Sequence, residues 1–573
     1  MRFLECAEAF NLLEKTPSRL EMTSILSELF KKVSKDEIQP LIYILQGIIA
    51  PPYEGIDMGF GEKFALDAIA SASGHLKKEV EFQFKKLGDL GLVGEFFLSK
   101  KKQLFLSQKD LTIESLYFSF LKIAKTSGKG SQELKKKYLI ETLNNASALE
   151  SRFIIRFVLG ELRFGVGDPT ILDALSYVGA GNKSLREEIE RAYNICSDLG
   201  HVAKIFFQEP EKLKTFIVQP LKPLIPALAE RLSDPKAIIE KIGKCAVEYK
   251  FDGLRLQCHK KGEEVQLYSR KLEKITHMFP DIVSDIKSLK TKEIIFEGEA
   301  LAYNSKLKKY YSFQETMHRR RKHGIEQMSK DFPMVIFVFD VLYADGRDLT
   351  QKPYLFRRKA LEKIFPFKNL KQSEKFIVKT EKELQKIFQD ATGQNLEGIM
   401  AKDLNSPYTA GKRKFAWIKL KKSYGHSVDT IDCTIIGYYL GKGSRTKFGF
   451  GGLLCAVYNS DTSKFETIAN VGSGFSESDM EDLQKILDKI KISSPPRDLI
   501  FKTEPDFWVK PNYVAEIAFD EITLSPMHTC GLYDGKGYAL RFPRFIRLRE
   551  DKSFKECTTT KEAIDMHWLK NKK

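Results

Sequence analysis

The sequence predicts a multidomain protein with an all-α domain, an α+β domain and a small β-barrel domain, in that order. Up to about residue 211 the apolar residues recur at helical spacing, as they do over 154–159. From about 242 to 422 short β-rich runs alternate with helical runs, which is typical of an α+β domain. After Gly425 short apolar runs are broken by glycines, which favours a small barrel. We expect the three domains to span residues 1–215, 216–424 and 425–573.

A proline-rich segment marks the first of these boundaries. Residues 220–226 contain three prolines, and neither a helix nor a central strand tolerates that density. We therefore expect residues 218–226 to form an irregular linker.

The chain carries a large positive charge. Lys and Arg number 93 and Asp and Glu 76 in 573 residues, so the net charge is +17 and the pI is about 9.2. This excess favours a polyanionic partner, with nucleic acid as the first choice and a membrane surface as the alternative. The hydrophobic share of 42% excludes disorder of the whole chain.

The sequence argues against membrane insertion and against export. The longest apolar run, 41–50, is about half the ~18 residues that span a bilayer. Glu5 and Glu8 interrupt the first apolar stretch, so we expect no signal peptide and an intracellular protein, cytoplasmic if the source is prokaryotic or archaeal. The eight cysteines form no C-x-x-C pair, which predicts reduced, buried thiols and neither a zinc site nor a disulfide framework.

A lysine lies between two carboxylates on one face of a predicted strand. Alternation over 246–252 places Glu248, Lys250 and Asp252 on the same face. The simpler interpretation is a solvated strand with surface ion pairs, but the following Gly253 and Arg255 favour a reactive lysine. A lysine amine is a nucleophile only when it is neutral, and flanking carboxylates alone would keep it charged. A cation, from the protein or a metal, must therefore share this site.

Two further predicted strands carry paired charges at the same spacing. Glu297 and Glu299 share one face, and so do Lys419 and Lys421. Paired carboxylates suit a hard divalent cation, and paired lysines suit a triphosphate. Each pair alone is a weak signal, but the three strands together are a specific combination.

Three other segments complete the candidate set. Glu397 and Lys402 are five residues apart and cannot share a regular strand face, so we expect a bulge or a lysine just past the strand end. Residues 334–342 are typical of a buried strand, in which Phe339 can stack on a base. Residues 540–552 carry five cations among aromatics, which fits nucleic-acid contact; a solvated charged tail is the alternative.

In this order the segments resemble the signature motifs of ATP-dependent DNA ligases, within the covalent nucleotidyltransferase superfamily. Lys250-x-Asp252-Gly253-x-Arg255 resembles the first motif, whose lysine takes AMP as a phosphoramide in that family. The other matches are Ser269-Arg270, Glu297-Gly-Glu299, Phe339-Asp340, Glu397-Gly-x-Met-x-Lys402, Trp417-x-Lys419-x-Lys421 and the run from Arg541 to Lys552, the last carried on an OB-fold.

The first third of the chain resembles the helical DNA-binding domain of the archaeal and eukaryotic replicative ligases. The matching segments are 50–55, 155–165 and 197–200. This resemblance implies nicked duplex DNA as the partner of a monomeric protein, and it distinguishes the chain from capping enzymes. A clamp-binding peptide with paired aromatics is matched only poorly by residues 103–106, so support for a sliding-clamp partner is weak.

Three residues depart from the family pattern. Lys271 stands where Asn is usual, Glu297 where Asp is common and Ala227 where Met is usual. None of these departures removes a reacting group.

The resemblance implies an enzyme that seals 5′-phosphate/3′-hydroxyl nicks through a lysyl-AMP enzyme and a DNA-adenylate, in DNA replication, repair, recombination and cell division. It implies ATP and Mg²⁺, with Mn²⁺ as the alternative metal, and a large rotation of the OB-fold domain. The implied roles are Lys250 as nucleophile; Glu248 on the adenine amine; Arg255 and Glu299 on the ribose side; Phe339 under the base; Arg413, Lys419 and Lys421 on the nucleotide phosphates; Arg270 on the DNA 5′-phosphate; Arg549 and Lys552 over the pyrophosphate; and Glu299 and Glu397 on the metal.

Three other functions compete with this one. An RNA ligase or a GTP-using capping enzyme shares the lysine motif but lacks the helical third. A catalytically silent nucleic-acid scaffold explains the charge of +17 but leaves Lys250 and Glu397 without a purpose. A NAD-dependent ligase is disfavoured, since its four-cysteine zinc module is absent from the sequence.

Overall fold

The computed structural model describes ten stretches of the chain, which form two compact units. The first unit comprises residues 1–83 and 90–425, and the second comprises residues 84–89 and 426–573. The described residues are 1–100, 110–232, 234–304, 309–311, 313–316, 319, 324–394, 396–421, 429–550 and 552–571.

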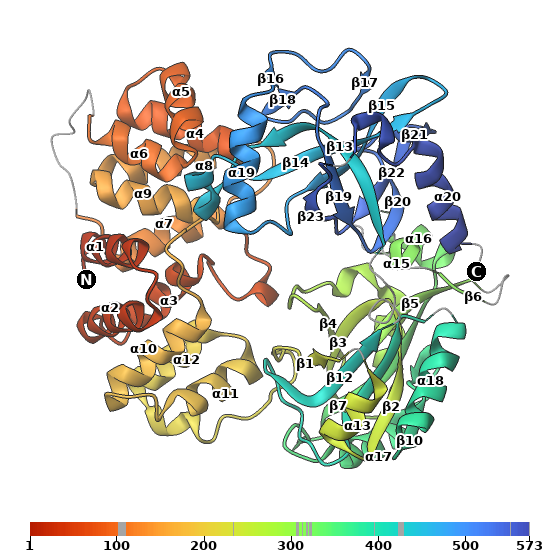
Figure 1. The fold of residues 1–573 in the computed structure, drawn as a ribbon. Helices are drawn as coiled ribbons and strands as arrows, with labels where there is room; N and C mark the ends of the chain where they lie inside the picture. The colour runs from red at the N-terminus through yellow and green to blue at the C-terminus, as the bar shows by residue number, and fades with distance from the viewer. Residues whose placement is uncertain are drawn as a thin grey trace. The chain divides into compact units, whose positions relative to one another are not determined.

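The first part of the chain is helical, as the sequence predicts (Figure 1). Its helices begin and end at local signals. At the start of α9, for example, the Ser147 side chain accepts from the Glu150 N–H and the Glu150 carboxylate accepts from the Ser147 N–H. The helices are α1 (Phe3–Lys15), α2 (Arg19–Lys32), α3 (Ile38–Gln46), η1 (Pro52–Glu54), α4 (Glu62–Ser73), α5 (Lys77–Leu87), α6 (Leu90–Leu98), α7 (Ile113–Lys125), α8 (Ser131–Asn145), α9 (Ala148–Val158), α10 (Asp168–Ala180), α11 (Arg186–Cys196), α12 (Leu199–Gln208) and η2 (Pro210–Leu213).

The rest of the first unit is built on two sheets. A five-stranded sheet has the order β1-β12-β11-β2-β10, and a seven-stranded sheet has the order β4-β3-β5-β7-β8, with β6 paired to β5 and β9 to β7. The strands are β1 (Leu228–Arg231), β2 (Cys245–Lys250), β3 (Leu254–Lys261), β4 (Glu264–Ser269), β5 (Glu293–Asn304), β6 (Lys309–Tyr310), β7 (Met334–Ala344), β8 (Arg347–Asp348), β9 (Leu370–Gln372), β10 (Lys375–Val378), β11 (Gly398–Asp403) and β12 (Arg413–Lys421). The helices are α13 (Pro235–Ile242), η3 (Thr276–Met278), α14 (Pro280–Lys287), α15 (Phe313–Thr316), α16 (Ile325–Asp331), α17 (Tyr354–Ile364) and α18 (Glu381–Gly393).

These two sheets share an apolar cluster, so one face of each lies against the other. Trp417 of the five-stranded sheet packs in this cluster with Ile295 and Leu342 of the seven-stranded sheet. α17 contacts β7, while α13 contacts β12 and α18 contacts β2 and β11. Lys250 and Lys421 lie on strands of the five-stranded sheet and Glu299 lies on a strand of the seven-stranded sheet, and the shared cluster brings the two sheets together.

The proline-rich segment 218–226 has no helix or strand, as predicted, but it is not a free linker. Leu224 is fully buried, and its N–H donates to the Gln257 Oε1 at 2.8 Å. The Leu221 N–H donates to the His259 Nδ1 at 3.0 Å. Side chains of β3 therefore hold this segment against the seven-stranded sheet.

The second unit is rich in β-strands around a buried apolar core. One sheet has the order β16-β18-β13-β14-β15-β17, with β19 joining β13 to β23, and a smaller sheet has the order β20-β22-β21. Its elements are β13 (Thr430–Tyr439), η6 (Gly443–Phe448), β14 (Gly452–Asn459), β15 (Lys464–Val471), α19 (Glu477–Asp488), β16 (Lys491–Ile492), β17 (Leu499–Ile500), β18 (Phe507–Val509), β19 (Val514–Ala518), β20 (Glu521–Ser525), β21 (Cys530–Tyr533), β22 (Lys536–Arg541), β23 (Arg544–Leu548), η7 (Phe554–Glu556) and α20 (Thr560–Asn571).

Two general expectations can be checked on both units. All eight cysteines are free and buried, which confirms the prediction from their spacing. Within the described ranges, no helix combines the length and the apolar character needed to cross a membrane.

A buried ion pair fixes α17 to β7. The Arg357 guanidinium donates to both oxygens of Asp340, at 2.8 and 3.0 Å, and both side chains are almost completely buried. Removal of one partner leaves the other charge buried and unpaired. Arg357→Met should therefore lower the free energy of unfolding of the first unit by about 3–5 kcal/mol, measured by urea unfolding.

The matched control is Arg347→Met, which removes an exposed arginine from β8. It should change the unfolding free energy by less than about 0.5 kcal/mol. Equal losses in the two variants would contradict a structural role for the Arg357–Asp340 pair.

Candidate active site

Three neighbouring strands gather two lysines around one carboxylate. β12, β11 and β2 lie side by side in the five-stranded sheet. Lys250 ends β2 and Lys421 ends β12, and both ammonium groups form ion pairs with Glu397. Burial raises the pKa of Glu397, but the two lysines outweigh that effect and the net pKa is lowered. Glu397 is therefore an ionised partner shared by two cations.

Gly398 determines where the Glu397 carboxylate lies. Its φ is 149°, and a Cβ there would lie 2.1 Å from the Leu420 carbonyl oxygen, so only glycine fits. Gly398 opens β11 and is paired with both Lys250 and Lys421. The expected bulge, or lysine past the strand end, is wrong: Glu397 precedes the strand and Lys402 lies within it. The special backbone at Gly398 breaks the alternation on which that prediction depended.

Glu299 approaches this cluster from the other sheet. Burial and the negative charge of Glu397 raise its pKa to about 7, against the opposing effects of Lys250 and Arg255. The Gly253 N–H donates to Glu299 Oε1 at 3.2 Å, so the loop after β2 orients the carboxylate. The two carboxylates, from different sheets, thus lie together beside Lys250.

Glu297, on the same strand as Glu299, has a different environment. It is fully buried and accepts from the Arg255 guanidinium at 2.9 Å and from the Tyr408 hydroxyl at 2.8 Å. These contacts are consistent with the prediction that Glu297 and Glu299 share one face of β5. Of the two, only Glu299 lies beside Lys250 and Glu397. Arg255 also donates to the Ala227 carbonyl at 2.9 Å, which ties it to the end of the proline-rich segment.

Glu248 lies deeper than the sequence suggests. Its carboxylate is almost fully buried and accepts from the Tyr354 hydroxyl at 2.5 Å and from the Lys402 ammonium at 2.9 Å. Burial lowers the pKa of Lys402, while Glu248 and Asp340 act in the opposite direction. Arg358 adds a second positive group, 3.9 Å from Glu248.

An aromatic platform lies beside these charges. Phe339 is half-buried on β7 and meets Trp417 edge to face, with ring centroids 5.9 Å apart. The Lys402 ammonium lies 5.0 Å and the Arg255 guanidinium 5.5 Å from the Phe339 ring centroid. The ring is therefore placed to receive a planar, electron-rich group next to Glu248.

Other predicted residues lie at the edges of this site or outside it. Lys419 is half-buried on β12, opposite Met400, and Arg270 is exposed in the turn after β4. Asp252 lies beyond the end of β2 and is exposed. Arg413 begins β12, but its side chain lies outside the described part of the chain.

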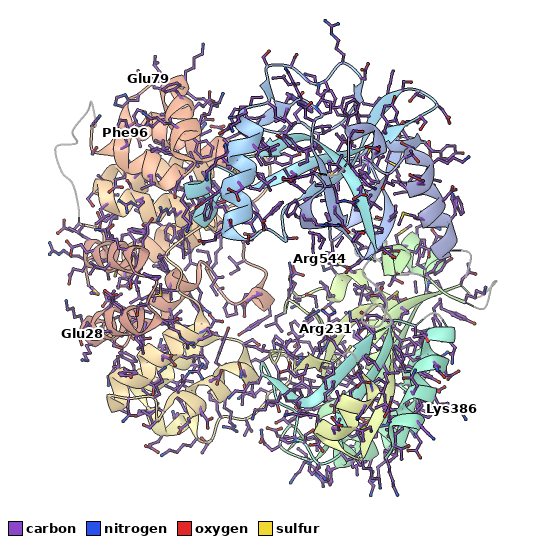
Figure 2. The ribbon with its side chains drawn as sticks, viewed as in Figure 1. Glu28, Glu79, Phe96, Arg231, Lys386 and Arg544 are labelled. Carbon is purple, nitrogen blue, oxygen red and sulfur yellow. The ribbon has the colours of Figure 1, made fainter. Side chains whose placement is uncertain are left out.

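In the second unit the predicted cations of residues 540–552 are all paired. Arg549 and Lys552 both bind Asp432 of β13, at 3.1 and 2.7 Å. Arg544, labelled in Figure 2, binds Asp520 at 2.8 Å. Arg541 pairs with Glu521 and Arg547 with Glu516. In this arrangement carboxylates of the second unit form ion pairs with these cations. The composition of residues 540–552 alone does not predict these ion pairs.

Sequence reasoning missed several residues that build the site. One polar face at the start of α17 carries Tyr354, Arg357 and Arg358 at i, i+3, i+4 spacing. This spacing is the pattern from which the three residues could have been predicted. Gln257 and His259 alternate with Arg255 on one face of β3 in the same way. Tyr408 gives no such signal, since its loop reaches Glu297 only in the folded chain.

The donor set fits a hard divalent cation. Glu299 and Glu397 offer carboxylate oxygens, and burial, with a smaller effect of Glu397, raises the pKa of Glu299. Mg²⁺ is commonly held by one or two carboxylates together with substrate phosphates. Within the described residues no group of three or more His, Cys, Asp or Glu side chains is arranged to hold a metal. The fit therefore depends on a phosphate substrate that completes the ligand set.

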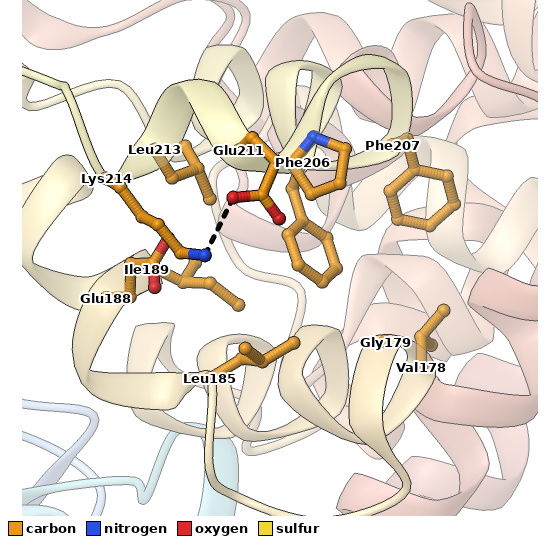
Figure 3. Close-up of a pocket in the computed structure, with 11 residues that line it drawn as sticks. Val178, Gly179, Leu185, Glu188, Ile189, Phe206, Phe207, Glu211, Leu213 and Lys214 are labelled. Atoms are coloured by element: carbon orange, nitrogen blue, oxygen red, sulfur yellow. Dashed lines mark hydrogen bonds and ion pairs between the residues drawn. The ribbon is translucent and has the colours of Figure 1, made fainter.

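A separate cavity lies in the helical part (Figure 3). It has a volume of about 390 Å³ and apolar walls that include Leu185, Ile189 and Phe206, with the Lys214–Glu211 ion pair beside it. None of its lining residues is a predicted site residue. The chemistry therefore belongs to the cluster around Lys250 and not to this cavity.

Two facing sheets that bring together a lysine, carboxylates of both sheets and an aromatic platform are the arrangement expected of a nucleotidyltransferase domain. Comparison with known families agrees and is more specific. Residues 226–421 match the ATP dependent DNA ligase domain, residues 2–176 the DNA ligase N terminus, and residues 446–552 the ATP dependent DNA ligase C terminal region. The chain belongs to the ATP-dependent DNA ligase family.

Full-length relatives carry the same assignment. The chain is 45% identical over 578 residues to a probable DNA ligase of Dictyoglomus turgidum, covering 99% of this chain and 97% of the relative. It is 42% identical over 592 residues to a DNA ligase of Sulfurisphaera tokodaii, covering 100% and 98%. The solved structure named Pmar-Lig_PreS3 has the same fold, with a TM-score of 0.57 and 18% identity over 95% of this chain and 99% of that one. The chain is thus an ATP-dependent DNA ligase, an enzyme that uses ATP and acts on nicked DNA.

The buried His259 makes the anchoring of the proline-rich segment sensitive to acid. Burial lowers its pKa from 6.5 to about 3, so the folded protein keeps the ring neutral where the unfolded chain protonates it. This contribution to stability is fully present above pH 6.5 and is lost as the pH falls toward 3, by about 1.4 kcal/mol per pH unit. In His259→Gln the unfolding free energy should fall less steeply between pH 6 and 4 than in the unmodified protein, measured by urea unfolding.

His277→Gln is the control, because that side chain is exposed. It should leave the pH dependence unchanged. A His259→Gln protein with the original acid sensitivity would show that other groups account for it.

Proposed function

We propose that Lys250 is the nucleophile of this ligase and that the reaction proceeds by three phosphoryl transfers. In the first, the Lys250 Nζ attacks the α-phosphorus of the substrate ATP while the bond to the pyrophosphate oxygen breaks. In the second, AMP passes from the lysine to the 5′-phosphate of the nick. In the third, the 3′-hydroxyl attacks that phosphate and AMP leaves.

The observation that carries the proposal is that Glu397 is shared by Lys250 and Lys421. A carboxylate bound to one lysine alone would hold that lysine charged. While Lys421 shares the carboxylate, its positive charge offsets part of the negative charge that would hold Lys250 protonated. A divalent cation bound beside Lys250 would act in the same direction and favour the neutral amine that attacks.

The nucleotide roles are those that the family resemblance implies. Phe339 would stack on the base, and Glu248 would accept from the adenine amine. Arg255 and Glu299 would hold the ribose side, Lys419 and Lys421 the phosphates, and Arg413 would reach the nucleotide. Glu299 and Glu397 would hold Mg²⁺, or Mn²⁺ in its place, which supplies positive charge next to the transferring phosphate.

The helical part would bind the duplex through phosphate contacts. Gly160 and residues 162–166 and 45–47 line a hollow of about 180 Å³, and Arg163 is among the lining residues. This loop overlaps the segment 155–165 that resembles the ligase DNA-binding domain. Arg270 would hold the 5′-phosphate of the nick. Since such contacts release counterions, DNA affinity should fall steeply with salt.

We further propose the domain roles. Residues 1–215 would form the DNA-binding domain, 216–424 the adenylation domain and 425–573 an OB-fold that rotates between steps. Arg549 and Lys552 would leave Asp432 to bind the pyrophosphate during the first step. We propose a monomer that acts inside the cell in replication, repair and recombination. A clamp-binding role of residues 103–106 has weak sequence support, and that segment lies outside the described residues.

Lys250→Ala should lose the AMP adduct completely, since no other amine occupies the end of β2. Intact mass after incubation with ATP, GTP or NAD and Mg²⁺ measures the adduct, and a nicked duplex then tests sealing. The variant should still seal a nick that is supplied already adenylated, because the third transfer does not use the lysine nitrogen. An AMP adduct on this variant would overturn the assignment of Lys250.

Lys552→Ala should slow formation of the AMP adduct by at least about tenfold, because it removes a charge-assisted contact to the leaving pyrophosphate. Rapid-quench measurement of the adduct gives this rate, and sealing of a pre-adenylated nick should change much less. Arg544→Ala, from the same cationic run, is the control and should leave the rate within about twofold. An unchanged first step in Lys552→Ala would contradict the closing role.

A further inference from the structure

The carboxylate of Glu248 is held on both oxygens by side chains that lie outside the recognised motif of β2. The Tyr354 hydroxyl donates to Oε1 at 2.5 Å, and the Lys402 ammonium donates to Oε2 at 2.9 Å. Lys402 also donates to the Phe339 carbonyl at 3.2 Å. The carboxylate and the aromatic platform are therefore linked through one ammonium group.

Tyr354 is itself fixed. Its side chain is fully buried, where it packs with Ala246 and Leu404, and its N–H donates to the Ser406 carbonyl at 2.9 Å. One turn later Arg357 binds both oxygens of Asp340, which locks α17 against β7. The buried Tyr354 side chain cannot change its rotamer freely, so the position of α17 determines the position of the hydroxyl. The hydroxyl in turn determines the position of Glu248 Oε1.

The remaining capacity of Glu248 is that of a pure acceptor. An ionised carboxylate offers about four lone-pair positions and no proton. Tyr354 and Lys402 use one position on each oxygen, which leaves acceptor capacity for a further donor. Adenine presents an amine at its six-position, which donates, whereas guanine presents a carbonyl, which accepts. A guanine there would place two acceptors against each other in a buried site.

We propose that Tyr354 is a positioning residue that fixes Glu248 as an acceptor, and that it thereby makes the ligase select adenine over guanine nucleotides. This inference rests on the proposed contact of Glu248 with the base. Arg358, on the same helix as Tyr354, lies 3.9 Å from Glu248. Without the Tyr354 hydroxyl, the Glu248 carboxylate can rotate, so that its acceptor is no longer fixed opposite the six-position of the base.

The test is the ratio of adduct formation rates with ATP and GTP, measured by intact mass on the full-length Tyr354→Phe protein with Mg²⁺. The ratio should fall by about tenfold or more relative to the unmodified protein, as expected when a charge-assisted hydrogen bond is lost. Tyr438→Phe is the matched control. Its buried hydroxyl donates to Asp488 at 2.6 Å in the second unit, so it should leave the ratio unchanged.

A second variant separates this inference from the contact on which it rests. Glu248→Gln places an amide N–H₂ donor beside the base and should shift the ratio toward GTP more strongly than Tyr354→Phe. If Glu248→Gln leaves the ratio unchanged, Glu248 does not read the base and the proposed contact is wrong. If Glu248→Gln shifts the ratio and Tyr354→Phe does not, the contact stands and the role of Tyr354 is overturned.

Discussion

The buried ion pair between Glu297 and Arg255 is the interaction on which the catalytic part of the molecule depends. Glu297 has no exposed surface, so its charge is tolerated only because Arg255, Gln257 and Tyr408 all donate to it. Arg255 also binds the Ala227 carbonyl, and the Ala227 N–H donates to Tyr408. One carboxylate thus ties the proline-rich segment, β3, β5 and the loop before β12 together. The loop that carries Gly253, and with it the orientation of Glu299, rests on this frame.

The carboxylates of the site divide into two groups by what neutralises them. Glu297 and Asp340 each bind an arginine on short hydrogen bonds, and Glu248 binds Lys402. Each of these three has a cationic side chain of the protein as a fixed partner. Glu299 and Glu397 differ, since Glu397 is divided between two lysines and the pKa of Glu299 is raised to about 7. Glu299 and Glu397 can therefore change their ion-pair partners. The binding of phosphates and a cation requires such a change.

The sequence predicts this site well where strands are regular and poorly where contacts are distant. Alternation gives the facing of Glu297 and Glu299 because a strand has a period of two. It fails at Glu397, since the positive φ of Gly398 interrupts that period. The prolines predict an irregular segment at 218–226, but its anchors on β3 are more than thirty residues away. The partners of the cations in residues 540–552 were missed for the same reason: Asp432, for example, lies on another strand.

In the proposed function, the placement of Glu248 and Lys250 on one strand would link base recognition to the chemistry. Both side chains leave the same face of β2, two residues apart, and strand geometry fixes their separation along the chain at roughly 6.5–7 Å. A base held at Glu248 therefore sets the position of its own phosphates relative to the lysine amine. Tyr354 of α17 fixes the Glu248 carboxylate, and Gly398 places Glu397, the ion-pair partner of Lys250. Because different elements control the two ends, selectivity for the base can change without moving the nucleophile.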